Sequence, residues 1–312
     1  MTNLCTSTFS LKNPSSIETY LSQDGYSSWK KIISGEIPKS EVITIIKESG
    51  LRGKGGAGFS TGLKWSFINS SDQQKYLVCN SDESEPGTCK DRDILRYNPH
   101  AVIEGMLIAS YAIGASVGYN YLRGEFIGDQ WVVFNKAVKE AYEYNFIGKN
   151  ILKSNLCIEI VPLIGAGAYI VGEETAMLES IEGKRGMPRI KPPFPAVQGL
   201  YGKPTIINNT ETLATVPYII KNGSEWYKNL GVNDSDGVKM FCMSGHLNKP
   251  SVIEAPLGVP FSKLLNECKG VLDDKKLKAV IPGGSSVPVV KGEDIMETPM
   301  DYESLMKIGT ML

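Results

Sequence analysis

The chain has 312 residues, 42% hydrophobic and 21% charged, which is enough apolar material for a sizeable core in two domains or in one large domain with an appendage. Its 33 lysines and arginines balance 34 aspartates and glutamates, which argues against a nucleic-acid-binding surface. No apolar run approaches the roughly 18 residues of a membrane span, and residues 1–16 carry no targeting pattern, so a cytoplasmic protein is expected.

The first predicted elements are two helices and a strand. A helix is predicted over 38–49, with Ser40 as its N-cap and Gly50 just past its end, and a second helix over 60–69. A buried strand follows over 76–79 and leads into the acidic turn SDESEPG.

Strand and helix patterns then alternate as far as residue 181. The further predictions are a long buried helix over 99–112, a strand over 117–123, a helix over 129–144, a strand over 157–163 and a helix past Gly172 to Ile181. This βαβαβ order predicts an α/β fold with a mostly parallel, Rossmann-like sheet flanked by helices.

The alternating pattern of strands and helices ends after this predicted helix. Five prolines between 183 and 204 exclude a helix or a central strand there, and long loops inside compact domains are usually functional. A linker is predicted over 231–237. Beyond it, strands over 238–244 and 251–255, a helix over 260–268 and a strand over 279–282 predict a small ββαβ unit, which makes a second α+β domain.

Six scattered cysteines contain no Cys-x-x-Cys pair, so free thiols are expected, with a metal site drawn from distant cysteines as the alternative. His100 and His246 stand far apart without neighbouring ligand residues. Structural or surface roles are expected for both.

The most informative motif is LRGKGGAGF over 51–59. Its glycines leave the backbone amides almost bare, beside the cations Arg52 and Lys54 and shortly before Lys64. Amide donors next to fixed positive charge are what a phosphate-bearing ligand needs. A flexible surface loop is the alternative interpretation.

Two further loops follow predicted strands, at the place where an open parallel sheet binds ligands. The loop over 79–87 concentrates polar side chains that can accept hydrogen bonds from sugar or ribityl hydroxyls; a solvated acidic turn is the alternative. The loop over 165–175 places Tyr169 as an aromatic face before Glu173 and Glu174. Stabilisation of a helix end would by itself explain these two carboxylates.

Six motifs together resemble one family. They are LRGKGGAGF, GLKWSF, CNSDESEPGT, GAGAYIVGEETA, PRIKPPFPA and PTIINNTETLA. The chain from Leu51 onward is similar to the NADH- and FMN-binding subunit of respiratory complex I, and to its diaphorase relatives in NAD-linked hydrogenases and formate dehydrogenases. The resemblance implies hydride transfer from NADH directly to FMN, followed by transfer of single electrons to iron–sulfur clusters and ultimately to quinone.

The resemblance also implies site residues. Those implied for FMN are Arg52, Gly53, Gly55, Lys64, Asn80, Asp82, Glu83, Gly172, Glu173, Asn208, Asn209 and Thr212. Those implied for NADH are Phe59, Phe67, Glu85, Tyr169, Glu174, Lys191 and Phe194. No side chain is expected to act as acid, base or nucleophile, although Glu85 would lie near the reacting atoms.

By the same resemblance, 1–232 would be the FMN- and NADH-binding domain with an N-terminal helical extension, and 233–297 a β-grasp-like domain. Residues 298–312 would begin a linker to the family's helical [4Fe–4S] domain, whose cluster ligands would lie beyond Leu312, so no metal ligands are expected. The implied partners are NADH and other hydrophilic complex I subunits, including a thioredoxin-like [2Fe–2S] subunit, on the cytoplasmic face and peripheral to the inner membrane. A fragment or a shortened gene product, acting as a non-catalytic binding or assembly module, is the alternative.

Overall fold

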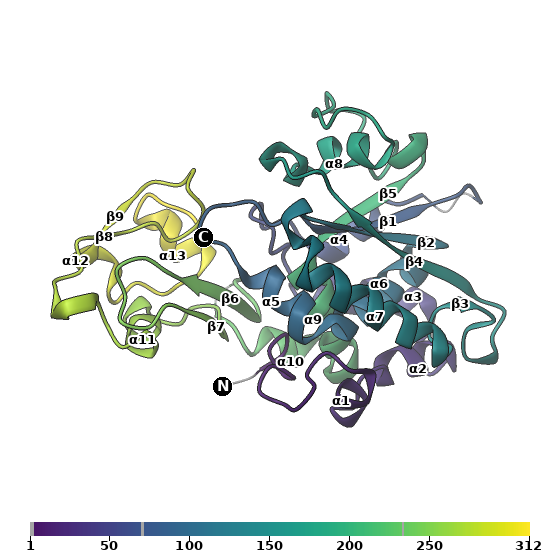
Figure 1. Cartoon of the computed structure of the whole chain (residues 1–312), viewed down its shortest axis with the longest axis horizontal. Helices are drawn as coiled ribbons and strands as arrows, with labels where there is room; N and C mark the ends of the chain where they lie inside the picture. Colours follow the sequence, from purple (N-terminus) through teal and green to yellow (C-terminus); the bar gives the residue numbers. More distant parts are fainter. Residues whose placement is uncertain (1–2, 70–71, 233) are drawn as a thin grey trace.

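The computed structural model describes residues 3–69, 72–232 and 234–312. Its larger part is built on a five-stranded sheet in the order β3-β4-β2-β1-β5 (Figure 1). The strands are β1 (Tyr76–Ser81), β2 (Val117–Leu122), β3 (Gly148–Lys149), β4 (Cys157–Ile164) and β5 (Thr205–Asn209). All neighbours pair in parallel except the short edge strand β3. The predicted mostly parallel sheet is confirmed.

Helices cover both faces of this sheet, which explains why its strands are apolar on both sides. In β1, Leu77 and Cys79 point into the main core, whereas Val78 between them joins a second cluster on the opposite face. The main core lies under α6 (Pro99–Ile113), α7 (Asp129–Glu143) and α9 (Thr210–Asn222), and the second cluster lies under α8 (Glu174–Ile181). The predicted flanking helices are thereby confirmed.

The position of β5 creates a topological switch point. The chain moves outward from β1 through β2 to β4 and then returns to pair with the other side of β1. The carboxyl ends of β1 and β5 are therefore neighbours at the place where the order of the strands along the chain reverses. Ligands of open α/β sheets bind at such a place.

The remaining helices of the larger part are short. They are α1 (Ile17–Ser22), α2 (Ser27–Ile33), α3 (Lys39–Glu48), α4 (Thr61–Ser66), α5 (Lys90–Tyr97) and α10 (Ser224–Lys228), with 3-10 turns η1 (Gly124–Ile127), η2 (Ile151–Lys153), η3 (Tyr169–Gly172) and η4 (Leu200–Gly202). The N-terminal helices are fixed by the buried carboxylate of Glu104, which accepts hydrogen bonds from the Tyr20 hydroxyl and the amides of Tyr26 and Trp29.

Some predicted boundaries were wrong. Pro38, not Ser40, holds the N-cap position of α3, because its extended backbone precedes the first helical residue and Ser40 already lies in the first turn. The helix predicted over 60–69 ends at Ser66, with Ser60 as its cap. Helix α8 starts only at Glu174, because Glu173 caps it.

The C-terminal part has its own hydrophobic cluster, which includes Phe241, Leu264 and Ile295. Its elements are β6 (Val238–Met243), β7 (Ser251–Pro256), α11 (Phe261–Glu267), η5 (Leu272–Asp274), β8 (Ala279–Val280), β9 (Val290–Lys291), α12 (Gly292–Ile295) and α13 (Tyr302–Lys307). The strand predicted over 279–282 shortens to β8, which pairs with β9 rather than with the β6–β7 hairpin. The predicted linker over 231–237 includes residue 233, which lies outside the described residues.

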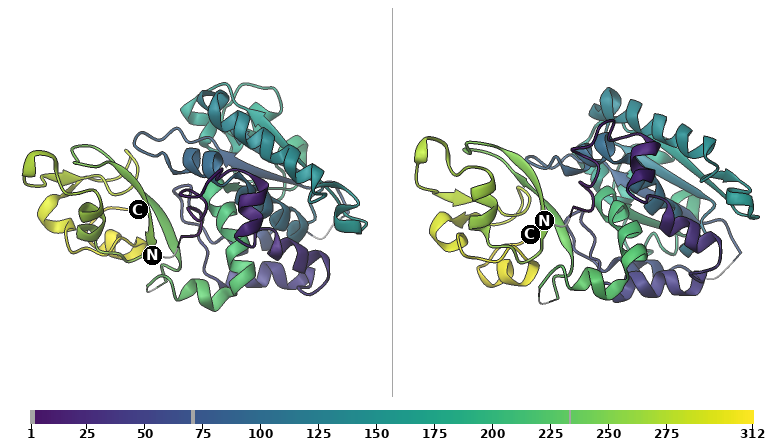
Figure 2. Two further views of the ribbon diagram at one scale, coloured as in Figure 1. Left: turned by 60° about the horizontal axis from the view of Figure 1, so that its bottom comes forward. Right: turned by 90° about the horizontal axis from the view of Figure 1, so that it is seen from below.

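The β6–β7 hairpin is the side of the C-terminal part that faces the larger part of the molecule (Figures 1 and 2). Glu254 of β7 accepts hydrogen bonds from the amides of Leu4, Cys5 and Thr6, so the N-terminal segment is fastened to the hairpin. Among the described residues, no helix has both the length and the apolar character that a membrane crossing requires.

Candidate functional site

Four segments converge at the carboxyl ends of β1 and β5, and we call them the switch-point loops. They are residues 51–59, 80–87, 165–175 and 207–212. The side-chain amide of Asn80 donates to the carbonyl oxygen of Gly172 at 2.9 Å, which joins the second segment to the third. The amide of Lys54 donates to the Thr212 hydroxyl at 2.9 Å, which joins the first to the fourth.

The glycine segment lies directly against the start of α9. A Cβ atom on Gly55 would come within 3.2 Å of Asn209 Cβ, and Gly56 and Gly58 adopt positive φ angles of 119° and 61°. Because Gly55, Gly56 and Ala57 are exposed and carry at most a methyl group, a ligand can approach their amides. Gly53 instead donates its amide to the carbonyl of Phe59 at 2.8 Å, closing the loop on itself.

The three cations of this region have different surroundings. Arg52 bonds to Glu303 of α13 at 2.8 Å, and its guanidinium stacks over the ring of Tyr302 at 4.8 Å. Lys54 is buried and bonds to Thr215 at 2.8 Å, so its predicted place as a cation flanking the ligand loop is wrong. The reason is the buried carboxylate of Glu211, 3.5 Å away, which holds the ammonium group in the core.

Lys64, in contrast, lies at the convergence itself. Its ammonium donates to the carbonyl oxygen of Ile207 in β5 at 3.1 Å and lies 3.6 Å from the carboxylate of Glu174. Because the side chain is partly exposed, its charge remains available to a ligand.

In the segment after β1, Asp82 has an unusual environment. One carboxylate oxygen, Oδ2, is buried without a hydrogen-bond partner among the described residues, whereas Oδ1 accepts from the Ser84 hydroxyl at 3.1 Å. Burial raises the pKa of Asp82 to about 6, although the Ser84 hydrogen bond and Arg123 act in the opposite direction. The unpartnered oxygen is free to accept a hydrogen bond from a ligand.

The two glutamates that follow Asp82 in the chain differ in their burial and in their hydrogen-bond partners. Glu83 is buried and caps α5 by accepting from the amides of Asp91 and Arg92 at 2.8 and 3.0 Å; burial raises its pKa. Glu85 is near the surface and accepts from the amide of Ser285 and the hydroxyl of Tyr169, and these hydrogen bonds lower its pKa.

In the third segment, Glu173 and Glu174 behave differently. Glu173 accepts from the amides of Thr175 and Ala176 at 2.8 and 2.9 Å, so helix-end stabilisation does account for this residue. Burial tends to raise its pKa, but these hydrogen bonds and Lys191 together lower it. Glu174 instead lies 3.0 Å from Lys191 and 3.6 Å from Lys64, as an anion between two cations.

Exposed aromatic side chains border the convergence. The rings of Phe59 and Phe67 have centroids 6.2 Å apart at an interplanar angle of 47°, and the two residues are 44% and 53% exposed. Tyr169 and Phe194 are also more than half exposed. Exposed aromatic rings are suited to stacking against a flat, apolar group.

The start of α9 supplies two asparagines and a threonine. Asn208 accepts from the indole of Trp65 at 2.8 Å, and Asn209 caps the helix by accepting from the Glu211 amide at 3.0 Å. Thr212 is fully buried behind the glycine segment. Thr210 was not predicted as a site residue, although its hydroxyl bonds to Ser81 at 2.6 Å. The Asn-Asn-Thr run before an apolar helix was the available signal for it.

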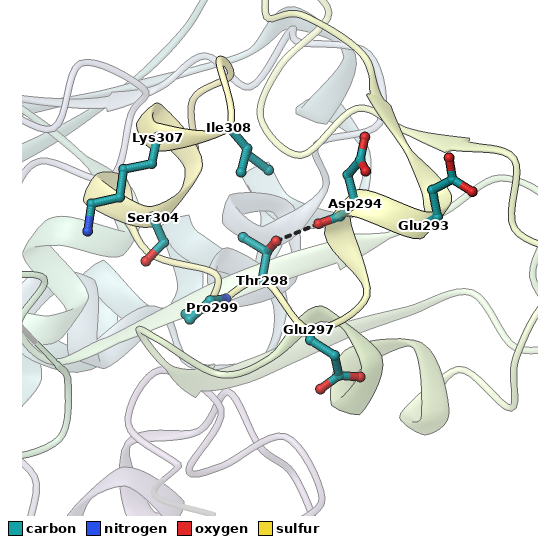
Figure 3. Close-up of a pocket in the computed structure, with 8 residues that line it drawn as sticks. All are labelled: Glu293, Asp294, Glu297, Thr298, Pro299, Ser304, Lys307 and Ile308. Carbon is teal, nitrogen blue, oxygen red and sulfur yellow. Dashed lines mark hydrogen bonds between the residues drawn. The ribbon is translucent and has the colours of Figure 1, made fainter.

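A separate hollow of about 410 Å³ lies in the C-terminal part, between α12 and α13 (Figure 3). Its lining residues include Glu293, Lys307 and Ile308, and the hydroxyl of Thr298 donates across it to the carbonyl of Asp294 at 2.8 Å. It contains none of the predicted site residues. Across the described ranges, no group of three His, Cys, Asp or Glu side chains is placed to hold a metal ion.

Two family models match the chain. Residues 46–218 match the family model of the Nuo51 FMN-binding domain, and residues 239–311 match the SLBB domain. The chain is 49% identical to an NADH-quinone oxidoreductase subunit of Rhizobium meliloti, over 95% of its own length and 70% of the relative's. It is 52% identical to an NADH-quinone oxidoreductase subunit of Rickettsia bellii, over 88% and 66% of the two lengths.

Among solved structures, a chain of the NAD+-reducing [NiFe]-hydrogenase superposes with a TM-score of 0.77 at 30% identity. The alignment covers 100% of this chain and 49% of that one. The chain thus spans about two thirds of the length of these curated relatives and about half of the hydrogenase chain.

Proposed function

Since the chain belongs to the Nuo51 FMN-binding family, we propose that it is an NADH-oxidising flavoprotein module in which hydride passes from NADH to FMN. The observation that carries this proposal is the convergence of the four switch-point loops at the carboxyl ends of β1 and β5. A nucleotide-sized ligand there meets amides, a lysine, carboxylates and aromatic faces at once.

The residues fit the phosphate of FMN. Gly55, which is exposed together with Gly56, lies against Asn209 at the start of α9, and Lys64 bonds to Ile207, two positions earlier in β5, so in this proposal amide donors and positive charge serve the same phosphate. Asn209 supports this arrangement, because its side chain backs Gly55 and caps α9. In this arrangement Gly53, Asn208 and Thr212 hold the shape of the cradle, and Arg52 fixes its entrance through Glu303.

The residues also fit the ribityl chain and the ring edge. The free Oδ2 of Asp82 is an acceptor for a ribityl hydroxyl, and that hydrogen bond would satisfy an atom that is otherwise buried without a partner. Asn80 and Gly172 form the adjoining wall through their 2.9 Å hydrogen bond. In this proposal Glu83 and Glu173 do not contact the flavin directly. They support the site by capping α5 and α8.

For NADH we propose the outer layer of the same site. Phe59 and Phe67 offer two aromatic faces to the dinucleotide, and Tyr169 and Phe194 border it on other segments. Lys191 provides positive charge for the pyrophosphate, while Glu174 opposes an additional phosphate on the ribose. Glu85 stays ionised at neutral pH, because its hydrogen bonds lower its pKa, and so does not act as a proton donor.

FMN, when bound, supplies the two-electron acceptor for the hydride of NADH. The chain's own residues would bind and orient the two nucleotides, and none would act as acid, base or nucleophile. The names of the relatives support quinone as the final electron acceptor. From the resemblance of the sequence motifs we further propose that electrons reach it singly through iron–sulfur clusters, including that of a thioredoxin-like [2Fe–2S] subunit. The module would then sit peripherally, on the cytoplasmic face of the inner membrane.

A second arrangement is favoured by the structural likeness to the NAD+-reducing hydrogenase. In it the same module exchanges hydride with NAD+ as a diaphorase, and the electrons come from or go to a hydrogenase or a formate dehydrogenase. The site chemistry is identical in both arrangements. Only the partner subunits differ.

The test uses the purified chain supplied with FMN under anaerobic conditions. We expect retention of yellow flavin through gel filtration, bleaching of the visible flavin absorbance on addition of NADH, and NADH oxidation with ferricyanide as acceptor. Flavin that is retained but never bleached would refute the oxidoreductase and support a non-catalytic binding module. A folded chain that never retains flavin would refute the flavin site itself.

A further inference from the structure

Two cysteines from opposite parts of the molecule meet at the start of α5. Cys89 occupies the N-cap position of that helix and follows the switch-point segment 80–87 in the chain. Cys242 lies in β6 of the C-terminal part. The amide of Cys89 donates to Sγ of Cys242 at 3.3 Å, across 153 positions of sequence. A Cβ atom on Gly87 would lie 3.6 Å from the Ser244 hydroxyl, so the two backbones run close together here.

From this juxtaposition we propose that Cys89 and Cys242 form a redox-active dithiol, which a hydroperoxide converts into a disulfide bond between the two parts of the molecule. Both side chains are partly exposed, so a small oxidant can reach them. All six cysteines are free thiols in this structure. In reducing compartments, disulfides that form between such thiols are usually transient and redox-sensing.

The surroundings assign different roles to the two sulfurs. The Cys242 thiol hydrogen-bonds to Cys89 and lowers the pKa of Cys89; Arg92 assists, whereas partial burial, Glu83 and Asp93 oppose. The same pairing, together with burial, raises the pKa of Cys242. Cys89 is therefore the thiolate that attacks, and Cys242 is the thiol that resolves.

The proposed reaction balances with a hydroperoxide as the two-electron oxidant. The Cys89 thiolate attacks one peroxide oxygen, the O–O bond breaks, and an alcohol, or water from hydrogen peroxide, leaves with a proton from solvent. Cys89 is then a sulfenic acid. The Cys242 sulfur loses its proton and attacks the Cys89 sulfur, so that an S–S bond forms and hydroxide leaves as water. Two thiols have lost two electrons, and the peroxide has gained them.

The remaining cysteines have different settings. Cys5, Cys79 and Cys268 are buried, and burial raises the pKa of each thiol. Cys157 is exposed and lies at the start of β4, on the far side of the sheet from β5. Cys157 is therefore a matched control that tests whether exposure of a thiol is enough to cause its oxidation.

The experiment treats the whole chain with hydrogen peroxide, blocks the remaining thiols by alkylation, and maps the tryptic peptides without reduction. We expect a linked peptide that contains Cys89 and Cys242, a mass two hydrogens lower than that of the reduced protein, and reversal by a thiol reductant. Cys89→Ser and Cys242→Ser should each abolish the link, whereas Cys157→Ser should preserve it. The oxidised chain should melt roughly 5 °C higher than the reduced one, because the bond closes a long loop.

Separate alkylation of both cysteines after peroxide, or oxidation of Cys89 to a sulfinic acid without linkage, would overturn the proposal. The wild-type peptide map decides this even if a variant fails to fold. The measurement needs neither flavin nor NADH, so its outcome is independent of the proposed function.

Discussion

The side-chain amide of Asn80 donates a hydrogen bond to the backbone carbonyl of Gly172 at 2.9 Å, so one side chain ties together the loops that follow two different strands. Asn80 is the penultimate residue of β1, one of the two strands that meet at the switch point, and Gly172 directly precedes the cap of α8. Removing this contact should loosen one wall of the proposed flavin site while leaving the sheet intact.

We expect Asn80→Ala to weaken FMN binding by about tenfold, since a lost hydrogen bond with one partner left unsatisfied corresponds to roughly 1–3 kcal/mol. Quenching of flavin fluorescence during titration gives the dissociation constant. Asn222→Ala removes an exposed asparagine at the far end of α9 and should leave the constant unchanged. Equal losses in both variants would show that the effect is not local.

Gly55→Val should abolish flavin retention. A Cβ atom there would already lie 3.2 Å from Asn209 Cβ, and branching at that carbon would fill the space that a phosphate must enter. The amount of flavin that remains after gel filtration gives the result. The control is Gly128→Ala, at a position with an ordinary φ of −73° and no atom within 4 Å of the new methyl group. Wild-type stoichiometry in Gly55→Val would contradict the placement of the phosphate.

Glu174→Gln should narrow the preference for NADH over NADPH by at least several-fold. Its charge lies between Lys191 and Lys64, and neutralising it removes the repulsion of a 2′-phosphate while freeing two cations. The ratio of kcat/KM values with ferricyanide as acceptor measures this preference. Glu267→Gln, which neutralises an exposed carboxylate in α11, should leave the ratio as it was. An unchanged ratio in Glu174→Gln would show that Glu174 does not distinguish NADH from NADPH.

Asp82 should make the flavin-free protein less stable as the pH rises. Its folded pKa of about 6 lies above the ordinary value of 3.8, so the folded state holds a proton that the unfolded state has lost. The stability that this proton contributes is complete below the ordinary pKa and disappears as the pH rises through the folded one.

Asp82→Asn should therefore be more stable than the wild type at about pH 7.5 and should lose this advantage near pH 4. Because Asp82 is only partly buried, the screened difference is about 1 kcal/mol. Urea unfolding at the two pH values measures it, with the exposed Asp273→Asn as control. A gain of equal size at both pH values would show that titration of Asp82 is not its cause.

The parts of the fold that could be predicted are those with uninterrupted local patterns. Helix α6 is a long, mostly apolar segment, and strands β1 and β4 are short segments rich in apolar residues, so their positions were clear from the sequence alone. Strand β5 was missed because it follows a proline-rich loop and ends in two asparagines, and only its pairing with β1 makes it a strand. Helix α5 was missed because its charged residues continue the acidic turn before it.

The site was predictable in its composition but not in its internal pairing. Arg52 and Lys54 in the glycine motif and Lys64 after it look equivalent in the sequence. Their anionic neighbours are Glu303, Glu211 and Glu174, more than 100 positions away along the chain. Which cation remains available to a ligand depends on these distant partners. The chain order alone contains no signal for them.

The bond between Arg52 and Glu303 has a consequence for the order in which the molecule matures on the ribosome. Synthesis is directional, and a nascent chain that ends after α9 already has all the strands of the central sheet. It still lacks α13, so Arg52 has neither Glu303 nor the ring of Tyr302 beside it. The entrance to the proposed nucleotide site would therefore be completed only when α13 has left the exit tunnel.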